Sequence, residues 1–197
     1  IETISAKGLF RTMAEAAWAC ADPGIQYDDT INDWHTNPET GRINASNPCS
    51  EYMSLDNSSC NLASLNLMMF LKDDDTFDAE KFAKSVEFVI TAMDISISFA
   101  DFPTEAIGDT TRRYRQLGIG YANLGALLMA TGLPYDSDAG RAFAGAITSL
   151  MTGTAYKRSA ELAGVVGAYD GYARNEDAHK RVMRKHAAAN DNVRSVS

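Results

Sequence analysis

The chain has 197 residues and a net charge of −8, and 45% of its residues are hydrophobic while 22% are charged. This length and composition are typical of one globular domain or of a large piece of one. The negative charge argues against binding to a nucleic-acid polymer, since such proteins usually carry a basic patch. No run of about 18 apolar residues is present, so no membrane span is expected.

The cysteine content favours a reducing environment. Three cysteines are too few, and odd in number, for a secreted scaffold built on disulfides. We therefore expect a cytoplasmic protein. The N-terminus has no basic region followed by an apolar segment, which argues against a signal peptide. It also lacks a starting methionine and opens directly on helical sequence, so we expect a fragment of a larger protein.

The first predicted element is a helix over residues 5–20, because apolar residues recur there at helical spacing. They are Leu9, Met13, Ala16, Ala17 and Cys20. Cys20 is therefore interpreted as a small core residue. The letters DPG at 22–24 end this helix. GIQYD is a short strand candidate, and residues 29–46 have the composition of a loop.

Residues 63–71 alternate between apolar and polar side chains, which predicts a strand with one face more deeply buried. A solvated turn follows at 72–76. Asp78 is the expected cap of a long helix that runs to about residue 101. Its inward positions are predicted to be Phe82, Val86, Val89, Ile90, Met93, Ile97 and Ala100.

Pro103 ends that helix. A buried strand then leads into a helix that stops at Gly132, which suits the position after a helix. Asp136 or Ser137 caps the next helix, over about 138–164, and Asn175 caps a last charged one. Strands separated by long helices predict an α/β architecture.

The stretch NPCSEYMSLDNSSCNLASLNL at 47–67 carries the candidate chemistry. In an extended backbone Asn47, Cys49 and Glu51 would point to one side, about 7 Å apart. Pro48 cannot donate a ladder hydrogen bond, so an extended loop that carries the three groups into a cavity fits better than a central strand. A thiol supplies a hydrogen atom or a nucleophile, a carboxylate takes a proton, and an amide holds a hydroxyl. Cys60 adds a second thiol, and two thiols can deliver two electrons.

Plainer interpretations stay open for the same residues. A free cysteine usually behaves as a small buried hydrophobe. Glu51 could be a surface carboxylate or a helix cap, and Asn47 a turn residue before proline. A zinc site is disfavoured, because Cys49 and Cys60 lack a CxxC partner and His35 is remote in sequence.

Two other patterns, a glycine cluster and a basic stretch near the C-terminus, resemble ligand-binding motifs, but we interpret both as structural. The glycines at 118, 120 and 125 are spaced GxGxxxxG, without the acidic residue expected in a dinucleotide-binding fold. We interpret them as sites of close strand–helix packing. The three histidines are interpreted as surface residues, and KRVMRKH at 180–186 as a solvated helix face.

The stretch GRINASNPCSEYMSLDNSSCNLASLNL at 41–67 resembles the active-site segment of adenosylcobalamin-dependent (class II) ribonucleotide reductases. DPGIQYDDTINDWHT, ADFPTEAI and LGIGYANLGALLMATGLPYDSDAGRA resemble further segments of the same proteins. The resemblance covers the chain from Ile1 to about residue 186. It implies that residues 1–197 form part of one catalytic domain, a ten-stranded α/β barrel. The N-terminal half and the C-terminal tail of that domain's parent are expected to lie outside this chain.

The resemblance also implies a role for each residue of the motif. Cys49 would carry the radical at the tip of a finger loop and take the 3′ hydrogen atom of a ribonucleotide. Glu51 would accept the proton of the 3′ hydroxyl, and Asn47 would bind the ribose. Cys60 would be one of two cysteines that end as a disulfide, with a partner outside this chain.

The implied cofactor is adenosylcobalamin, which makes the radical, while the protein orients and shields the reactants. The expected partners are a ribonucleoside di- or triphosphate, thioredoxin or a similar dithiol, and a second copy of the whole protein. One alternative is a class I large subunit, which takes its radical from a second protein. Another is a truncated fragment without activity.

Overall fold

The computed structural model describes residues 3–22 and 24–194 of the chain. The helices and strands in chain order are α1 Ala6–Cys20, α2 Asp28–Asp33, β1 Asn61–Asn66, η1 Leu67–Phe70, α3 Ala79–Ile97, α4 Glu105–Tyr114, β2 Leu117–Ala122, α5 Leu124–Ala130, α6 Asp138–Val166 and α7 Tyr172–Arg194. The described part is therefore rich in helix and contains a small parallel sheet, in keeping with the expected α/β class. The ten-stranded barrel stays a prediction.

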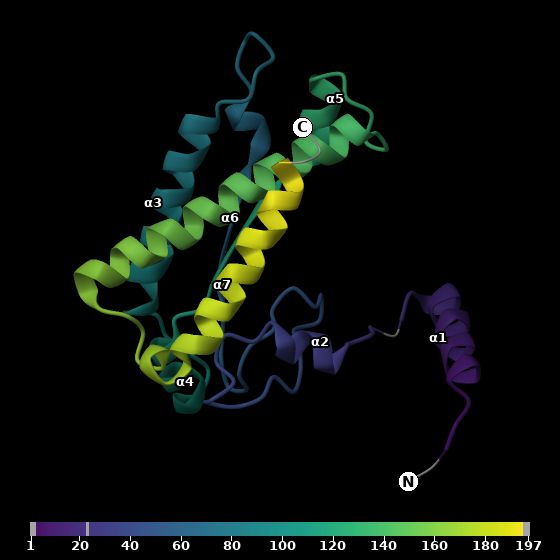
Figure 1. Cartoon of the computed structure of the whole chain (residues 1–197), viewed down its shortest axis with the longest axis vertical. Coiled ribbons are helices and arrows are strands. Elements are labelled where there is room, and N and C mark those ends of the chain that lie inside the picture. The colour runs from purple at the N-terminus through teal and green to yellow at the C-terminus, as the bar shows by residue number, and fades with distance from the viewer. Residues whose placement is uncertain (1–2, 23, 195–197) are drawn as a thin grey trace.

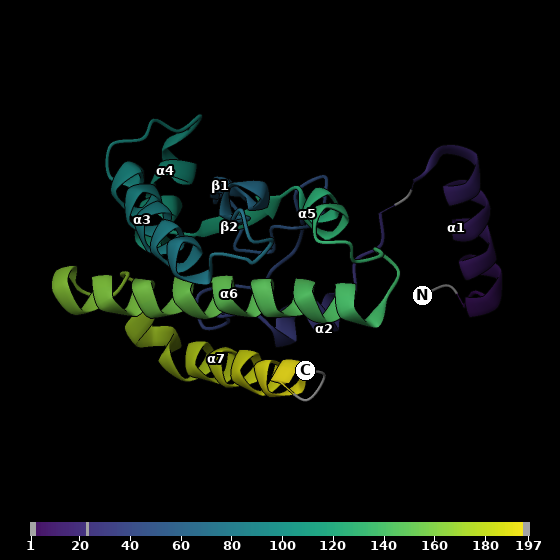
Figure 2. The ribbon, with the colours of Figure 1, turned by 90° about the horizontal axis from the view of Figure 1, so that it is seen from above.

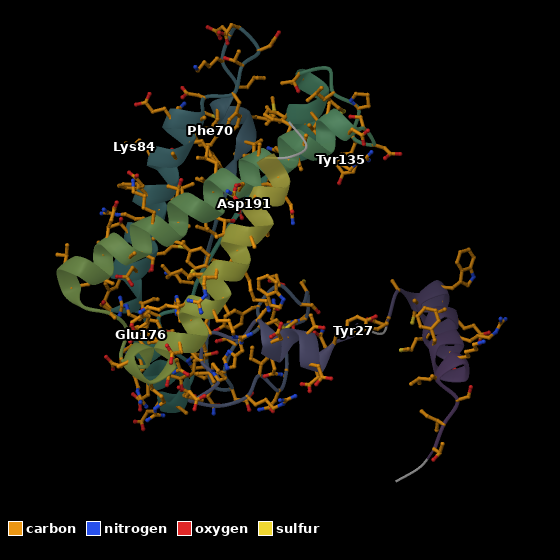
Figure 3. The ribbon with its side chains drawn as sticks, in the orientation of Figure 1. Tyr27, Phe70, Lys84, Tyr135, Glu176 and Asp191 are labelled. Atoms are coloured by element: carbon orange, nitrogen blue, oxygen red, sulfur yellow. The ribbon has the colours of Figure 1, made fainter. Side chains whose placement is uncertain are left out.

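Helix α1 stands apart from the other elements (Figure 1). It begins where the Ser5 hydroxyl accepts the Gly8 N–H at 3.2 Å, and it ends at Ala21, whose backbone is left-handed. None of its residues is buried. Tyr27 lies on the connection to α2 and is exposed (Figure 3). The prediction that Cys20 is a core residue is wrong, because no described element covers the apolar face of α1.

The strand predicted at GIQYD is absent, and helix α2 begins at Asp28 instead. Two acidic residues, Asp28 and Asp29, occupy its first turn, where carboxylates interact favourably with the helix dipole. The Asn32 side chain then donates to the main chain of Asp28 and Ile43. The predicted loop 29–46 is thus partly helical at its start.

The sheet consists of β1 and β2, which pair in parallel with Asn61 opposite Leu117. The predicted alternation holds from Ala63 to Leu67. The strand is shorter than predicted, because the chain turns into the 3-10 helix η1 at Leu67. Asn66 ends the strand, since its side chain accepts the N–H of Met68 at 3.1 Å.

Helices α3 and α6 cover one side of the sheet and pack against each other (Figure 2). Asp78 caps α3 and Ser137 caps α6, as the sequence predicted. Gly132 adopts the expected left-handed backbone after α5. Phe70, labelled in Figure 3, lies among the helices. The core is formed by Leu67, Phe70, Phe82, Val86, Ile90, Met93, Leu127, Ile147 and Met151.

Asn175 lies inside helix α7 rather than at its start, so the predicted cap is wrong. Its side chain is 1% exposed and reaches into the 39–40 loop. The Oδ1 atom accepts the Glu39 N–H at 2.8 Å, and Nδ2 donates to Thr40 Oγ1 and to the Gly171 carbonyl. Two of these hydrogen-bond partners, Glu39 and Thr40, are distant in the sequence, so the local sequence pattern around Asn175 could not predict them.

Candidate active site

Residues 46–53 form a loop closed by an isolated antiparallel bridge between Ser46 and Met53. Inside it, the Ser50 N–H donates to the Asn47 carbonyl at 3.0 Å, so that residues 47–50 make a turn. The predicted extended backbone with three groups on one side is therefore wrong. Asn is favoured at the first position of such a turn and Pro at the second, which explains the geometry. Cys49 occupies the third position and is exposed.

The Asn47 side chain holds this loop together. Its Oδ1 atom accepts the main-chain N–H of Tyr52 at 2.9 Å. The Ser46 hydroxyl donates to the Asn47 carbonyl at 2.9 Å. The bond to Tyr52 fixes the orientation of the Asn47 side-chain amide, with its Oδ1 atom toward the loop. Among the described residues, Asn47 Nδ2 has no hydrogen-bond partner, so a donor is left for a ligand.

Glu51 follows the turn and is exposed. Its carboxylate lies close enough to Cys60 to contribute to the raised pKa of that thiol. No hydrogen bond joins Cys49 to Glu51 within the described part of the chain. The structure therefore places Asn47, Cys49 and Glu51 on one short loop and brings Glu51 into the electrostatic range of Cys60.

Cys60 is half-buried immediately before β1. Burial, with the negative charge of Glu51 as a smaller cause, raises the pKa of its thiol to about 11. The thiol donates weakly to the Asn61 carbonyl at 3.6 Å. At neutral pH Cys60 therefore stays a protonated thiol, which suits it to hydrogen donation rather than to nucleophilic attack.

Gly118 on β2 faces Cys60 across the sheet. A Cβ atom built at Gly118 would lie 2.9 Å from the Cys60 sulfur and would also clash with the Leu62 side chain. The expected close packing is present, but it joins strand to strand rather than strand to helix. The packing interpretation is wrong for Gly125, because a Cβ there would meet nothing within 4 Å.

Sequence reasoning missed Tyr52 and Thr111. The Tyr52 hydroxyl lies 2.8 Å from Ser58 Oγ and 3.4 Å from the Ser59 carbonyl. Burial raises the pKa of this phenol, and nearby Cys60 adds to the effect. Thr111, which is 1% exposed on α4, accepts the Ser59 N–H at 3.0 Å. Only the position of Tyr52 inside the quoted motif could have drawn attention to it.

The histidine interpretation is wrong for His35, which is 3% exposed. Its Nδ1 atom accepts the Asn37 N–H at 3.3 Å, so Nε2 carries the proton and donates to the Gly41 carbonyl at 2.9 Å. Burial lowers the pKa of this imidazole. The ring is neutral and serves the fold of the loop.

The stretch KRVMRKH is not simply a solvated face. Arg181 and Lys185 both pair with Asp33 of α2, and Val182 is buried. The Lys185 ammonium also lies 4.1 Å from the ring centroid of Trp34. The stretch therefore anchors α7 to α2.

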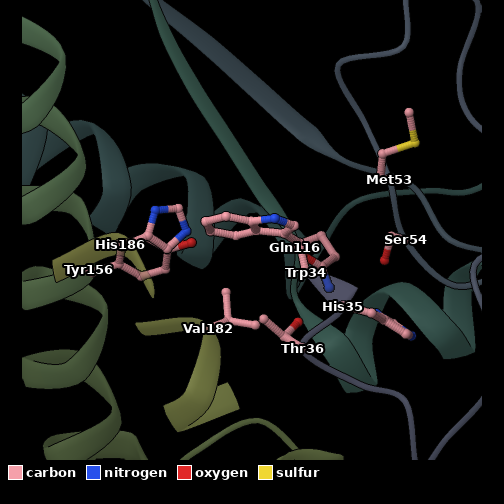
Figure 4. A pocket seen from close by; sticks show the side chains of 9 residues that line it. All are labelled: Trp34, His35, Thr36, Met53, Ser54, Gln116, Tyr156, Val182 and His186. Atoms are coloured by element: carbon pink, nitrogen blue, oxygen red, sulfur yellow. The ribbon is translucent and has the colours of Figure 1, made fainter. Parts of the chain in front are cut away.

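Two cavities of about 310 Å³ each open on the described residues. In the first, Tyr156 and His186 gather at one side while Met53 and Ser54 lie at the other (Figure 4). The second is lined by Arg42, Arg113 and Arg174, among others. Within the described residues, no group of three or more His, Cys, Asp or Glu side chains could hold a metal ion. No helix in that part is long and apolar enough to cross a bilayer.

The sequence matches the family model "Ribonucleotide reductase, barrel domain" over residues 1–195. A "Vitamin B12-dependent ribonucleotide reductase" of Streptomyces avermitilis is 77% identical over 194 residues, covering 96% of this chain and 20% of the relative. The protein of that name from Rhodopirellula baltica is 53% identical over 188 residues, covering 95% of this chain and 18% of the relative. A "Vitamin B12-dependent ribonucleoside-diphosphate reductase" of Mycobacterium tuberculosis is 33% identical over 172 residues, 87% of this chain and 25% of the relative. The chain thus spans about a fifth of the length of the most similar of these relatives.

Proposed function

The chain belongs to the ribonucleotide reductase barrel-domain family, and from this premise we propose that it supplies the catalytic loop of a vitamin B12-dependent (class II) ribonucleotide reductase. The observation that carries the proposal is the family match over residues 1–195, joined to relatives whose names state both the reaction and the vitamin. The whole protein would contain a ten-stranded barrel and would convert ribonucleotides to deoxyribonucleotides.

In this proposal each group of the loop has one task. The Cys49 sulfur takes the 3′ hydrogen atom of the ribose, and Glu51 accepts the proton of the 3′ hydroxyl. The Nδ2 atom of Asn47 donates to a ribose hydroxyl. The exposed position of Cys49 on a turn supports this assignment, because a thiol there can approach a substrate.

Cys60 serves as one member of the reducing pair, and its partner lies outside this chain. The 2′ carbon–oxygen bond breaks, and the oxygen leaves as water. The two thiols give up two protons and two electrons and become a disulfide. Cys49 returns its hydrogen atom to the 3′ carbon. The raised pKa of Cys60 supports this role, because hydrogen donation starts from the protonated thiol.

The cofactor proposed for the whole protein is adenosylcobalamin, which when bound would supply the radical. The two cavities described above have about 310 Å³ each, near the lower limit of ligand pockets, so neither would enclose a corrin ring with its side chains. We therefore expect other parts of the whole protein to contribute to the cofactor site.

The remaining parts of the proposal concern the whole protein. Its substrate is a ribonucleoside di- or triphosphate, its reductant is thioredoxin or a similar dithiol, and it assembles as a homodimer in the cytoplasm. The three cysteines of this chain are free, which is compatible with a reducing compartment.

The decisive experiment gives the complete protein adenosylcobalamin, a ribonucleotide and a dithiol, and measures deoxynucleotide formation. Product that requires the cobalamin supports class II. Product only with a metal-radical protein subunit would instead assign class I, and no product under either condition would favour an inactive protein.

A further inference from the structure

Tyr52 lies between Cys49 and Cys60 in the sequence and forms hydrogen bonds with residues near each of the two cysteines. One contact uses its main chain. Its N–H donates to Asn47 Oδ1 at 2.9 Å, across the loop that carries Cys49. Because a backbone amide cannot rotate freely, this bond sets the orientation of the Asn47 amide.

The other contact uses the phenol. The Ser58 hydroxyl donates its hydrogen to the Leu55 carbonyl, so Ser58 Oγ is free to accept. The Tyr52 hydroxyl, 2.8 Å away, is therefore the donor. Burial raises the pKa of the phenol, which keeps its proton in place at neutral pH. Tyr52 thus holds the main-chain segment that leads directly into Cys60.

A second set of hydrogen bonds holds the same segment. Thr111 Oγ1 accepts the Ser59 N–H at 3.0 Å and lies 3.2 Å from Ser59 Oγ. Thr111 belongs to α4 and is 1% exposed, so its position is fixed by packing. Ser59 is therefore held between the Tyr52 phenol and a rigid helix.

We propose that Tyr52 is a positioning residue, whose main chain orients the Asn47 amide and whose phenol sets the place of the Cys60 thiol relative to the Cys49 turn. This inference rests on the proposed function of the loop. Reacting atoms must be held in a near-attack arrangement, and a misplacement of about 1 Å can cost roughly a hundredfold in rate. The phenol makes no proton transfer of its own.

The test uses the complete protein and the substitution Tyr52→Phe, which removes only the hydroxyl. We expect kcat to fall about tenfold while KM changes less than about twofold, because substrate binding groups are untouched. The matched control is Tyr121→Phe. The Tyr121 hydroxyl contacts Thr148 of α6 at 2.8 Å rather than a group of the Cys49 loop, so its loss should leave kcat unchanged.

A second readout follows Cys60 itself. Alkylation by iodoacetamide is measured against pH, and the peptide that contains Cys60 is quantified by mass spectrometry. Loss of the phenol should loosen residues 58–60 and admit water, so the alkylation midpoint of Cys60 should move to lower pH in Tyr52→Phe. The midpoint should not move in Tyr121→Phe.

Ser58→Ala tests the same contact from its other end and remains available if Tyr52→Phe folds poorly. It should reproduce the loss of kcat, and the double variant should be no slower than either single one. Unchanged kcat and unchanged alkylation in Tyr52→Phe would overturn the inference, as would a rise in KM alone. Independent, multiplying losses in the double variant would also overturn it. If the unmodified protein makes no deoxynucleotide, the proposed function fails, whereas the alkylation profile still decides whether Tyr52 places Cys60.

Discussion

Gly118 on β2 lies so close to Cys60, the residue before β1, that a methyl group on Gly118 would lie 2.9 Å from the cysteine sulfur. The Cys60 sulfur packs close to the backbone of Gly118, which has no side chain. Burial of this sulfur, with the charge of Glu51 as a smaller cause, raises the pKa of Cys60 to about 11.

Gly118→Ala should destabilise the complete protein by about 1–3 kcal/mol, because overpacking displaces Leu62 or Cys60. Urea unfolding measures this difference. Gly125→Ala is the matched control. Its Cβ meets nothing within 4 Å, and alanine favours the helix by about 1 kcal/mol over glycine, so stability should stay constant or rise. Equal losses in both variants would refute the packing argument.

Glu51→Gln should lower the pKa of Cys60, since the substitution removes the negative charge that disfavours the thiolate. The pH profile of Cys60 alkylation measures the change. Burial remains the larger cause, so the midpoint should stay above the ordinary value for cysteine. A midpoint that does not move would show that Glu51 does not act on this thiol.

The same raised pKa predicts how stability depends on pH. Between the ordinary value of 9.0 and about 11, the folded protein keeps the Cys60 proton while the unfolded chain releases it. The contribution is complete below pH 9.0 and is lost as pH rises through about 11. The free energy of unfolding should therefore fall more steeply there in the unmodified protein than in Cys60→Ser. Parallel curves for the two proteins would contradict the prediction.

Cys49→Ser in the complete protein should form no deoxynucleotide, because a hydroxyl cannot replace the thiol in hydrogen-atom transfer. The side chain is exposed, so the free energy of unfolding should change by less than about 0.5 kcal/mol. Product assays and urea unfolding are measured on the same preparation. Turnover at the normal rate would remove Cys49 from the proposed chemistry.

Asn175→Ala should destabilise the protein by about 1–3 kcal/mol, because the change removes the bonds that this side chain, which is 1% exposed, makes to Glu39, Thr40 and Gly171. Thermal unfolding measures the effect. Asn44→Ala is a suitable comparison, since Asn44 is exposed and bonds mainly to Asp56. A smaller loss at position 175 than at position 44 would contradict the structural role.

Much of the helical framework could be predicted, because its signals are local. Asp78 and Ser137 cap their helices through side-chain bonds within the next turn, and Gly132 needs only its own backbone freedom. The turn around Cys49 also follows local rules, since Asn-Pro favours a turn over an extended strand. The extended interpretation was wrong because it weighed side-chain alternation above turn chemistry.

The errors share another cause, which is contact between residues distant in sequence. His35 is an exception, because its bonds go to Asn37 and Gly41 of its own loop. Asn175 is polar but buried, because it bonds to the main chain of Glu39, 136 residues away in the sequence. Thr111 reaches Ser59 in the same way. Within the candidate site, sequence indicated the chemical groups, while the scaffold that holds them appears only in three dimensions. The roles of Asn47, Cys49, Glu51 and Cys60 stay predictions.

The parallel pairing of β1 with β2 has a consequence for folding. Asn61 lies opposite Leu117, and the chain between them contains α3 and α4. Closing such a long connection costs entropy before any strand contact repays it, so non-local pairing forms slowly. Helices α3 and α4 can form earlier from local contacts. The close packing of Gly118 against the Cys60 sulfur therefore forms only after β2 has been synthesised and has paired with β1.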